Sequence, residues 1–344
     1  MTDGSQNIQV VLKSRPDGWI DEKNFAVRAA PMPILADGQV LTRNLYLSCD
    51  PYLRGLMDGA ATYQPGQDLE KPIRARVVAE VLESRRPGHR AGDLVWGFLG
   101  WELHSLVPET ETLYPVDPSL GPISHFISIL GMPGLTAYVG MLEIGEPRPD
   151  ETVFVSAAAG AVGQIAGQLA RLHGARVLGS AGSAAKVAYL SDDLHFDAAF
   201  NYKTETDITA ALARHCPNGI DVYFENVGGK TLDAVLSHVN PHARIAVCGM
   251  ISQYNAAQPE PIFNLGKIVR NRVKMQGFVV GEHLAKLPEF TQRMSAWMGE
   301  GRIRYREDII DGIENIPRAF VGMFKGDNIG KRLVRVAPDP PVGQ

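Results

Sequence analysis

The chain has 344 residues, of which 45% are hydrophobic and 21% charged, which is typical of a globular protein with two domains. The net charge of −4 argues against a polyanionic partner, so we expect neither nucleic acid nor membrane binding. No apolar run approaches the roughly 20 residues that cross a bilayer, and the first residues lack a signal-peptide pattern. Cys49, Cys216 and Cys248 are too widely spaced for a disulfide framework, which predicts a cytoplasmic protein.

The chain up to residue 124 is rich in short β-like runs. Residues 39–48, 75–84 and 93–101 are runs of this kind, and a Pro-Gly pair separates the last two. Short strands divided by glycine and proline turns are typical of an antiparallel barrel. We therefore predict an antiparallel, barrel-like domain over residues 1–124.

From residue 125 the sequence alternates between apolar strands and helices. The run TVFVSA (152–157) is a continuous apolar strand, and residues 164–174 have the apolar spacing of a helix that ends at a glycine. This alternation predicts a doubly wound parallel sheet of the Rossmann type, an α/β fold, over residues 125–301. Further β-like runs predict that residues 302–344 return to complete the first domain.

The turn after the strand at 152–157 reads AAGAVG (158–163). This is the dinucleotide-binding fingerprint with its first glycine replaced by alanine. Gly160 allows the backbone to approach a pyrophosphate, Gly163 allows helix and strand to pack closely, and the helix N-terminus favours an anion. The alternative is a small-residue turn that only packs a helix on a sheet. The strand–turn–helix context favours the dinucleotide site.

The second strand of the sheet predicts which nicotinamide cofactor is bound. NAD enzymes place a carboxylate near the end of this strand, but here the stretch VLGSAGSAAK (177–186) contains none. Small residues followed by Lys186 offer space and positive charge for a 2′-phosphate, and Tyr202 is a further donor. The alternative for Lys186 is a solvated helix residue. We predict NADPH/NADP+ as the cofactor.

The sequence lacks the ligands of a zinc alcohol dehydrogenase. It has no CxxC pair, and the stretch where a zinc relative carries Gly-His-Glu reads PIRARVVAEV (72–81). Hydride delivery to a polarised C=C bond needs a nicotinamide, a pocket and a donor for the developing enolate oxygen. The sequence therefore predicts a metal-independent reductase.

Several segments together resemble a known family. These segments are CDPYLRGLM (49–57), GMPGLTAY (131–138), AAAGAVG (157–163), GSAAKVAYL (182–190), FNYKT (200–204), YFENVGG (223–229), CGMISQYN (248–255) and KGDNIGK (325–331). They resemble the leukotriene B4 dehydrogenase/prostaglandin reductase group of zinc-independent medium-chain dehydrogenases/reductases, which includes alkenal double-bond reductases and curcumin-reductase-like proteins. The resemblance implies a GroES-like domain plus a Rossmann domain, a homodimer, NADPH and no metal.

The resemblance also implies roles for individual residues. The pyrophosphate contacts are Gly160, Ala161, Val162 and Gly163, and the 2′-phosphate contacts are Lys186 and Tyr202. The other cofactor contacts are Met132, Thr136, Asn226, Cys248, Gly249, Met250, Ile251, Ser252, Tyr254, Phe278, Val279, Val280 and Asn328. Simpler alternatives are a turn residue for Asn226 and a small buried thiol for Cys248, for which we expect backbone contacts.

Tyr254 and Tyr52 match tyrosines that line the family's substrate pocket. A phenol can donate to a carbonyl oxygen as negative charge builds there, so both are candidate catalytic residues. The alternative for each is an aromatic wall, and for Tyr52 the two interpretations stay open. Ala75 and Arg76 depart from the family pattern, which commonly has glycines there.

The predicted reaction is the NADPH-dependent reduction of the C=C bond of α,β-unsaturated aldehydes and ketones, with hydride transfer to the β-carbon. The predicted partner is thus a small-molecule enone or enal. Quinone reduction would use the same parts and is the alternative enzyme activity. A catalytically idle NADPH-binding sensor is the alternative of another class.

Overall fold

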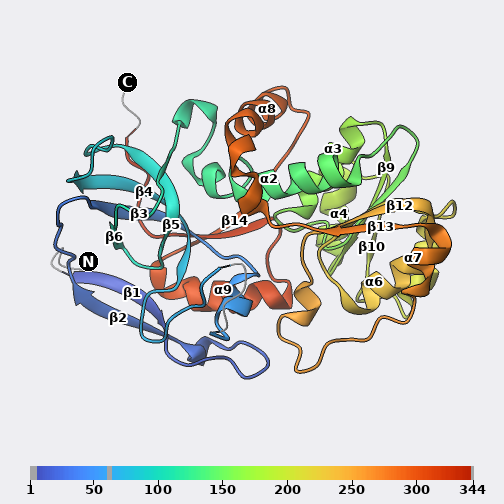
Figure 1. Ribbon diagram of the computed structural model, residues 1–344, viewed down its shortest axis with the longest axis horizontal. Helices are drawn as coiled ribbons and strands as arrows, with labels where there is room; N and C mark the ends of the chain where they lie inside the picture. The colour runs from blue at the N-terminus through green and yellow to red at the C-terminus, as the bar shows by residue number, and fades with distance from the viewer. Residues whose placement is uncertain (1–5, 60–63, 342–344) are drawn as a thin grey trace. The chain divides into compact units, whose positions relative to one another are not determined.

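The computed structural model describes residues 6–59 and 64–341, and the chain divides into two compact units (Figure 1). One unit comprises residues 1–127 together with 307–344, and the other comprises residues 128–306. The C-terminal segment therefore belongs with the N-terminal part of the chain.

The unit 1–127 with 307–344 consists mainly of β-strands. Its strands are β1 (Gln6–Leu12), β2 (Phe25–Pro31), β3 (Val40–Ser48), β4 (Arg74–Ser84), β5 (Leu94–Gly100), β6 (His104–Val107), β7 (Tyr114–Pro115), β14 (Glu307–Asp311) and β15 (Lys331–Arg335). Its helices are α1 (Leu53–Leu56) and α9 (Ile316–Lys325), with short helical turns η1 (Glu22–Asn24), η2 (Pro118–Leu120), η3 (Ile123–Ile127) and η8 (Ile313–Asn315). The main sheet has the order β14-β15-β3-β4-β5-β7, and β6 pairs with β3.

Most of these strands are antiparallel, as the turn-rich sequence predicts. Isolated bridges at Gln9–Glu102, Val11–Pro72 and Leu12–Leu69 connect the β1–β2 ribbon to the rest of the unit. The exception is the pair β14–β15, which is parallel. The two strands are parallel because α9 connects them and returns the chain in the same direction.

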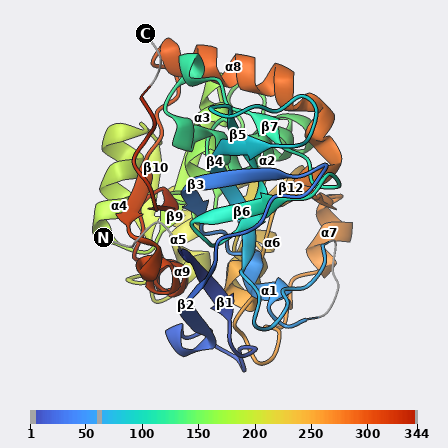
Figure 2. The same ribbon diagram turned by 90° about the vertical axis from the view of Figure 1, so that its left-hand side faces the viewer.

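An apolar core holds this unit together. Along β4 the side chains of Ala75, Val77 and Ala79 alternate inward and are fully buried, as expected for a strand with one face on the core. The Trp101 ring packs 6.0 Å from Phe25 and 5.5 Å from Phe320, between ring centroids. Phe320 belongs to α9, which lies beside the β1–β2 ribbon (Figure 2).

The unit 128–306 is a parallel sheet with helices. Its strands are β8 (Thr152–Val155), β9 (Arg176–Ala181), β10 (Ala198–Asn201), β11 (Ile220–Glu225), β12 (Val239–Val247) and β13 (Lys274–Gly277). Its helices are α2 (Met132–Tyr138), α3 (Gly163–Leu172), α4 (Ala184–Ala188), α5 (Ile208–His215), α6 (Gly229–Leu236), α7 (Gly266–Asn271) and α8 (Leu287–Gly299), with helical turns η4 (Val139–Gly145), η5 (Tyr189–Asp193), η6 (Ile251–Gln253) and η7 (Val280–Lys286).

The strand order β10-β9-β8-β11-β12-β13, with every neighbouring pair parallel, confirms the predicted doubly wound fold. Chain order reverses direction between β8 and β11, and α3 and α6 lie on opposite sides of the sheet (Figure 1). All four residues of β8 are buried, which explains its continuous apolar run. In such sheets, ligands bind outside the carboxyl ends of the strands at this reversal.

A buried ion pair fastens the returning strand β15 to the end of β3. The Lys331 side chain is 1% exposed, and its Nζ donates to the Asp50 carboxylate at 2.6 Å and to the Cys49 carbonyl oxygen at 2.8 Å. Lys331→Met should lower the free energy of unfolding by about 3 kcal/mol, because it leaves a poorly solvated carboxylate without its partner. Denaturant titration measures this loss.

Lys71→Met is the matched control. Lys71 pairs with Asp68 at 3.0 Å, but both side chains are about two-thirds exposed, at 70% and 67%. An exposed pair contributes at most about 1 kcal/mol, so this variant should unfold almost like the wild type. Equal losses in the two variants would show that burial of the Lys331 pair contributes nothing to stability.

Candidate cofactor and active site

The turn between β8 and α3 brings the helix very close to the strand. The backbone turns at Ala157, whose φ is +48°, and α3 begins at Gly163. A Cβ atom at Gly163 would lie 2.6 Å from the Ala157 carbonyl oxygen and 2.8 Å from the Ala158 Cα. These distances are too short for any side chain, so the close packing requires glycine at position 163.

Three consecutive backbone N–H groups lie at the start of α3. Within the unit 128–306, the N–H groups of Ala161, Val162 and Gly163 donate no hydrogen bond, whereas that of Gln164 donates to the Gly160 carbonyl oxygen at 3.2 Å. The ten-residue helix behind them adds the positive end of its dipole. This arrangement suits an anion, and its donors fit the pyrophosphate of a dinucleotide.

The carboxyl ends of β9 and β10 are adjacent because these two strands pair in parallel, and Lys186 follows β9 in α4 while Tyr202 follows β10 directly. A Cβ atom at Gly182, just after β9, would lie 3.1 Å from the Tyr202 hydroxyl and 3.3 Å from the Lys203 Cε. Burial raises the pKa of Tyr202, so its phenol keeps its proton at neutral pH and can donate. The Lys203 side chain, which the sequence analysis did not single out, lies against Gly182 as well.

A buried polar network lies under the turn at the ends of β8 and β11. The Ser156 hydroxyl oxygen accepts from the Tyr223 hydroxyl at 3.0 Å and from the Asn226 N–H at 3.0 Å. The Asn226 side-chain amide donates to the Ser156 carbonyl oxygen at 2.7 Å. The side-chain amide nitrogen of Asn226 therefore connects the ends of β8 and β11, which fits the simpler interpretation of a turn residue.

The segment 248–254 follows β12 and ends at Tyr254. The Tyr254 hydroxyl oxygen accepts from the Met250 N–H at 3.3 Å, and a Cβ atom at Gly249 would lie 2.9 Å from this hydroxyl. Burial raises the pKa of Tyr254, so the phenol is protonated at neutral pH. A hydroxyl that accepts one hydrogen bond becomes a better donor of another. The Tyr254 hydroxyl can therefore donate a hydrogen bond.

Cys248 lies in the same segment, and its thiol is in a setting that favours the unreactive, protonated form. Burial raises the pKa of its thiol to about 12, with a smaller contribution from the charge of Glu225. A thiol with such a pKa carries almost no thiolate at neutral pH, and the thiolate is the reactive form. This supports backbone contacts over thiol chemistry at Cys248. The N–H groups of Ile251 and Ser252 donate to the carbonyl oxygens of Asn226 and Val227, in the turn after β11.

Other predicted cofactor residues lie on α2 and after β13. The Thr136 hydroxyl donates to the Met132 carbonyl oxygen at 2.7 Å, so it is used within α2. A Cβ atom at Gly140 would lie 2.7 Å from the Phe278 ring, which therefore packs directly on this glycine. Half-buried Val279 and Val280 follow it.

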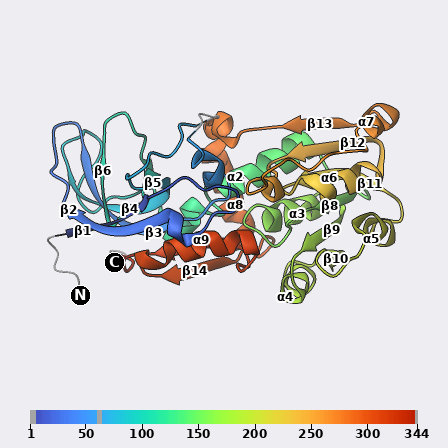
Figure 3. The ribbon, with the colours of Figure 1, turned by 90° about the horizontal axis from the view of Figure 1, so that it is seen from below.

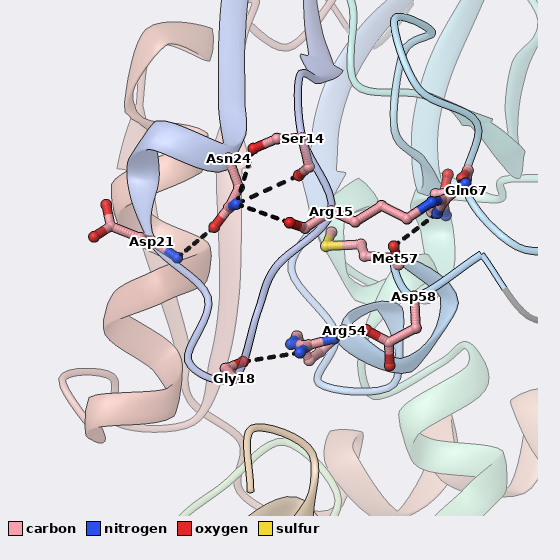
Figure 4. A network of polar contacts seen from close by, with 9 residues as sticks. All are labelled: Ser14, Arg15, Gly18, Asp21, Asn24, Arg54, Met57, Asp58 and Gln67. Atoms are coloured by element: carbon pink, nitrogen blue, oxygen red, sulfur yellow. Dashed lines mark hydrogen bonds and ion pairs between the residues drawn. The ribbon is translucent and has the colours of Figure 1, made fainter. Parts of the chain in front are cut away.

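Tyr52 and Asn328 belong to the other unit. Tyr52 is half-buried against that unit's core, immediately before α1. The adjoining chain is held by arginines: Arg54 donates to the Gly18 carbonyl oxygen at 2.8 Å and Arg15 to the Met57 carbonyl oxygen at 2.8 Å (Figure 4). Asn328 is buried and donates to the Gly330 carbonyl oxygen at 2.7 Å.

The structure thus gathers most of the predicted residues at one edge of the parallel sheet. The turns after β8, β11, β12 and β13 carry residues 158–163, 226, 248–254 and 278–280, and those after β9 and β10 carry Lys186 and Tyr202. Parallel strands place all these turns at the same edge. Glu225, at the end of β11, is the functional candidate that the sequence analysis missed, because it reads as an ordinary strand residue.

Among residues 6–59 and 64–341, no group of three or more His, Cys, Asp or Glu side chains is placed to hold a metal ion. His238 and His242 have the chain spacing of a ligand pair. However, a His238 ring nitrogen lies 2.7 Å from the Cys216 carbonyl oxygen, and His242 accepts from Arg272 at 3.2 Å. Over the same described residues, no helix is long and apolar enough to span a bilayer.

Comparison with known proteins gives matches along nearly the whole chain. Residues 8–116 match a family described as the N-terminal domain of oxidoreductase, and residues 161–298 match one described as zinc-binding dehydrogenase. The chain is 45% identical to the NADP(+)-dependent 2-alkenal reductase of Nicotiana tabacum, over 98% of this chain and 99% of that protein. It is 41% identical to prostaglandin reductase 1 of Rattus norvegicus, over 94% and 97%.

A solved structure is also similar. The crystal structure of CurA from Vibrio vulnificus in complex with NADPH has a TM-score of 0.90 and 38% sequence identity, and the match covers 96% of this chain and 100% of CurA.

Proposed function

The chain belongs to the medium-chain dehydrogenase/reductase family that contains the 2-alkenal and prostaglandin reductases, and on this basis we propose that it reduces the C=C bond of α,β-unsaturated aldehydes and ketones with NADPH. Membership agrees with the resemblance carried by the sequence motifs. The fold is that of the family, a Rossmann unit and a GroES-like unit. The observation that carries the proposal is the Tyr254 hydroxyl, which the Met250 N–H holds at 3.3 Å at the edge of the sheet where residues 161–163 lie.

The unit 128–306 binds the cofactor in this proposal. The N–H groups of residues 161–163 hold the pyrophosphate, and Lys186 and Tyr202 hold the 2′-phosphate. The absence of a carboxylate in residues 177–186 removes the group that would repel this phosphate. For Tyr52, which is half-buried before α1 in the other unit, the family resemblance implies a contact with the substrate.

When bound, NADPH supplies the hydride that reduces the β-carbon. Tyr254 donates a hydrogen bond to the carbonyl oxygen, where negative charge develops as the enolate forms. Its raised pKa keeps the proton on the phenol, so Tyr254 stabilises the oxygen without transferring the proton to solvent first. The α-carbon then takes its proton from water. No step in this scheme requires a metal ligand from the chain.

NADPH oxidation with a panel of enals and enones tests the proposal, with a quinone measured in parallel and a chelator present throughout. We expect turnover of the enals with unchanged rates after chelation. A higher kcat/KM for the quinone would favour the alternative enzyme activity. NADPH binding without any turnover would indicate the idle sensor instead.

Lys186→Ala should raise the NADPH dissociation constant by roughly one to two decades, because one charge-assisted contact contributes about 1.5–3 kcal/mol. NADH, which lacks the 2′-phosphate, should bind almost as before. Fluorescence titration measures both constants. The control Lys13→Ala removes an exposed cation from the other unit and should change neither. Equal weakening of both cofactors would mean that Lys186 has only a structural role.

Tyr254→Phe should lower kcat by roughly 10²-fold with little change in KM, because the lost hydrogen bond is made mainly in the transition state. The ring remains, so NADPH affinity should be nearly constant. Steady-state kinetics measure the effect, and Tyr114→Phe, on a ring stacked on Trp96 in the other unit, is the control. A rise in KM alone would restrict Tyr254 to substrate binding.

The family resemblance implies a homodimer, which we also propose. β13 is an edge strand of the parallel sheet, and α7 lies close to the start of this strand (Figure 3). Around α7 the side chains of Phe263 and Val269 are 81% and 82% exposed, and Leu265 is 51% exposed. Exposed apolar side chains beside an unpaired strand edge suit a second copy of the chain.

Light scattering should give twice the chain mass, and Val269→Glu should give a monomer. A monomeric wild type would refute the dimer.

We further propose that the protein works in the cytoplasm. All three cysteines are free, and two of them, Cys49 and Cys216, are buried. Free thiols suit a reducing compartment. Cell fractionation tests this location.

A further inference from the structure

Glu225 is a fully buried ionisable residue that the proposed reaction does not use. It is the last residue of β11 and 0% exposed. One carboxylate oxygen, Oε1, accepts from the N–H groups of Val227 at 2.5 Å and Gly228 at 3.0 Å. The same oxygen lies 3.2 Å from the Ser156 hydroxyl, which donates to it. The side chain therefore joins the end of β8 to the turn after β11.

The main chain of Glu225 makes a second connection. Its carbonyl oxygen accepts from the N–H groups of Cys248 at 2.9 Å and Gly249 at 3.2 Å. These two residues begin the segment that follows β12. Glu225 thus contacts three turns at the carboxyl edge of the sheet. It reaches the turn after β8 through Ser156, the turn after β11 through Val227 and Gly228, and the turn after β12 through Cys248 and Gly249.

The turn that Glu225 shapes carries the next part of the segment. The Asn226 carbonyl oxygen accepts from the Ile251 N–H at 3.0 Å, and the Val227 carbonyl oxygen accepts from the Ser252 N–H at 3.1 Å. The Ser252 hydroxyl donates to the same Val227 oxygen at 2.6 Å. These hydrogen bonds therefore hold residues 248–252 alongside residues 225–227, so the position of the second segment sets the position of the first.

Tyr254 lies at the end of this path. The turn η6 leads directly to it, and the Met250 N–H donates to its hydroxyl. A shift of the 226–228 turn would move Met250 and with it the phenol. Small displacements of a donor reduce its stabilisation of a developing charge strongly.

We propose that Glu225 is the positioning residue for Tyr254: by fixing the turn 226–228 through its carboxylate, it holds the segment 248–254 that presents the phenol. This inference rests on the proposed reductase function. A carboxylate suits the task because one oxygen can accept several N–H groups at once. The charge of Glu225 also contributes to the raised pKa of Tyr254, which agrees with their proximity.

Four variants test the proposal. Glu225→Ala removes the acceptor, Glu225→Asp shortens it, and Glu225→Gln keeps a carbonyl oxygen for the N–H groups of Val227 and Gly228. The matched control is Glu102→Ala in the other unit. Glu102 is likewise a largely buried glutamate, which accepts from Gln9 at 2.7 Å and Asn7 at 3.1 Å.

Hydrogen exchange of the peptide covering residues 248–254 gives a readout that does not depend on activity. Exchange should rise at least tenfold in Glu225→Ala, rise less in Glu225→Asp, and stay near wild type in Glu225→Gln and Glu102→Ala. If Glu225→Ala fails to fold, the comparison of Glu225→Asp with Glu225→Gln carries the test. Unchanged exchange in the folded Ala or Asp variants would overturn the proposal.

Kinetics then ask whether Glu225 acts through Tyr254. Glu225→Ala, or Glu225→Asp in its place, should lower kcat at least tenfold with KM within about threefold, and Glu225→Gln should restore it. In the Tyr254→Phe background the same substitution should lower kcat less than twofold, because its target is already gone. A full loss in both backgrounds would overturn the proposal. A wild type without enal reduction would refute the proposed function, while the exchange result would still decide the role of Glu225.

Discussion

The close approach of α3 to the end of β8 is the constraint on which the site depends. The helix begins so close to β8 that a Cβ atom at Gly163 would lie only 2.6 Å from the Ala157 carbonyl oxygen. This contact fixes the start of α3, and with it residues 161–163, at the carboxyl edge of the sheet. The chain order reverses at the same place, and this is the position at which doubly wound sheets bind their ligands.

Buried polar groups then connect the neighbouring turns to this one. Ser156, Asn226 and Glu225 join the ends of β8 and β11, and the Glu225 carbonyl oxygen extends the connection to the segment after β12. Each of these groups would cost free energy if it were buried without a partner. These bonds cross from one turn to another, so the network holds the three turns in fixed positions relative to each other. Tyr254 is presented by this network rather than by a strand or helix.

Particular residues show why part of the site was open to prediction. Gly160 and Gly163 were predictable because their spacing follows from a local geometry, a strand turning directly into a helix. The missing carboxylate before Lys186 was a local feature of the same kind. Glu225 was not predictable, because nothing in the run IDVYFE marks its carboxylate as the acceptor of two N–H groups beyond the strand. Lys203 was missed because only the pairing of β10 with β9 brings it to Gly182.

The sequence by itself determined the α/β class, the division into barrel-like and doubly wound parts, the glycine-rich turn between strand and helix, and the family, because these depend on periodicity and on short motifs. Only the tertiary structure decided the parallel pairing of β14 with β15, the burial of Lys331 against Asp50, and the hydrogen bond from Met250 to Tyr254. The first two join segments far apart in the chain, and the third depends on a turn shaped by a different strand. Contacts of this kind leave no pattern in the local sequence, since their partners are selected by the packing of the whole unit.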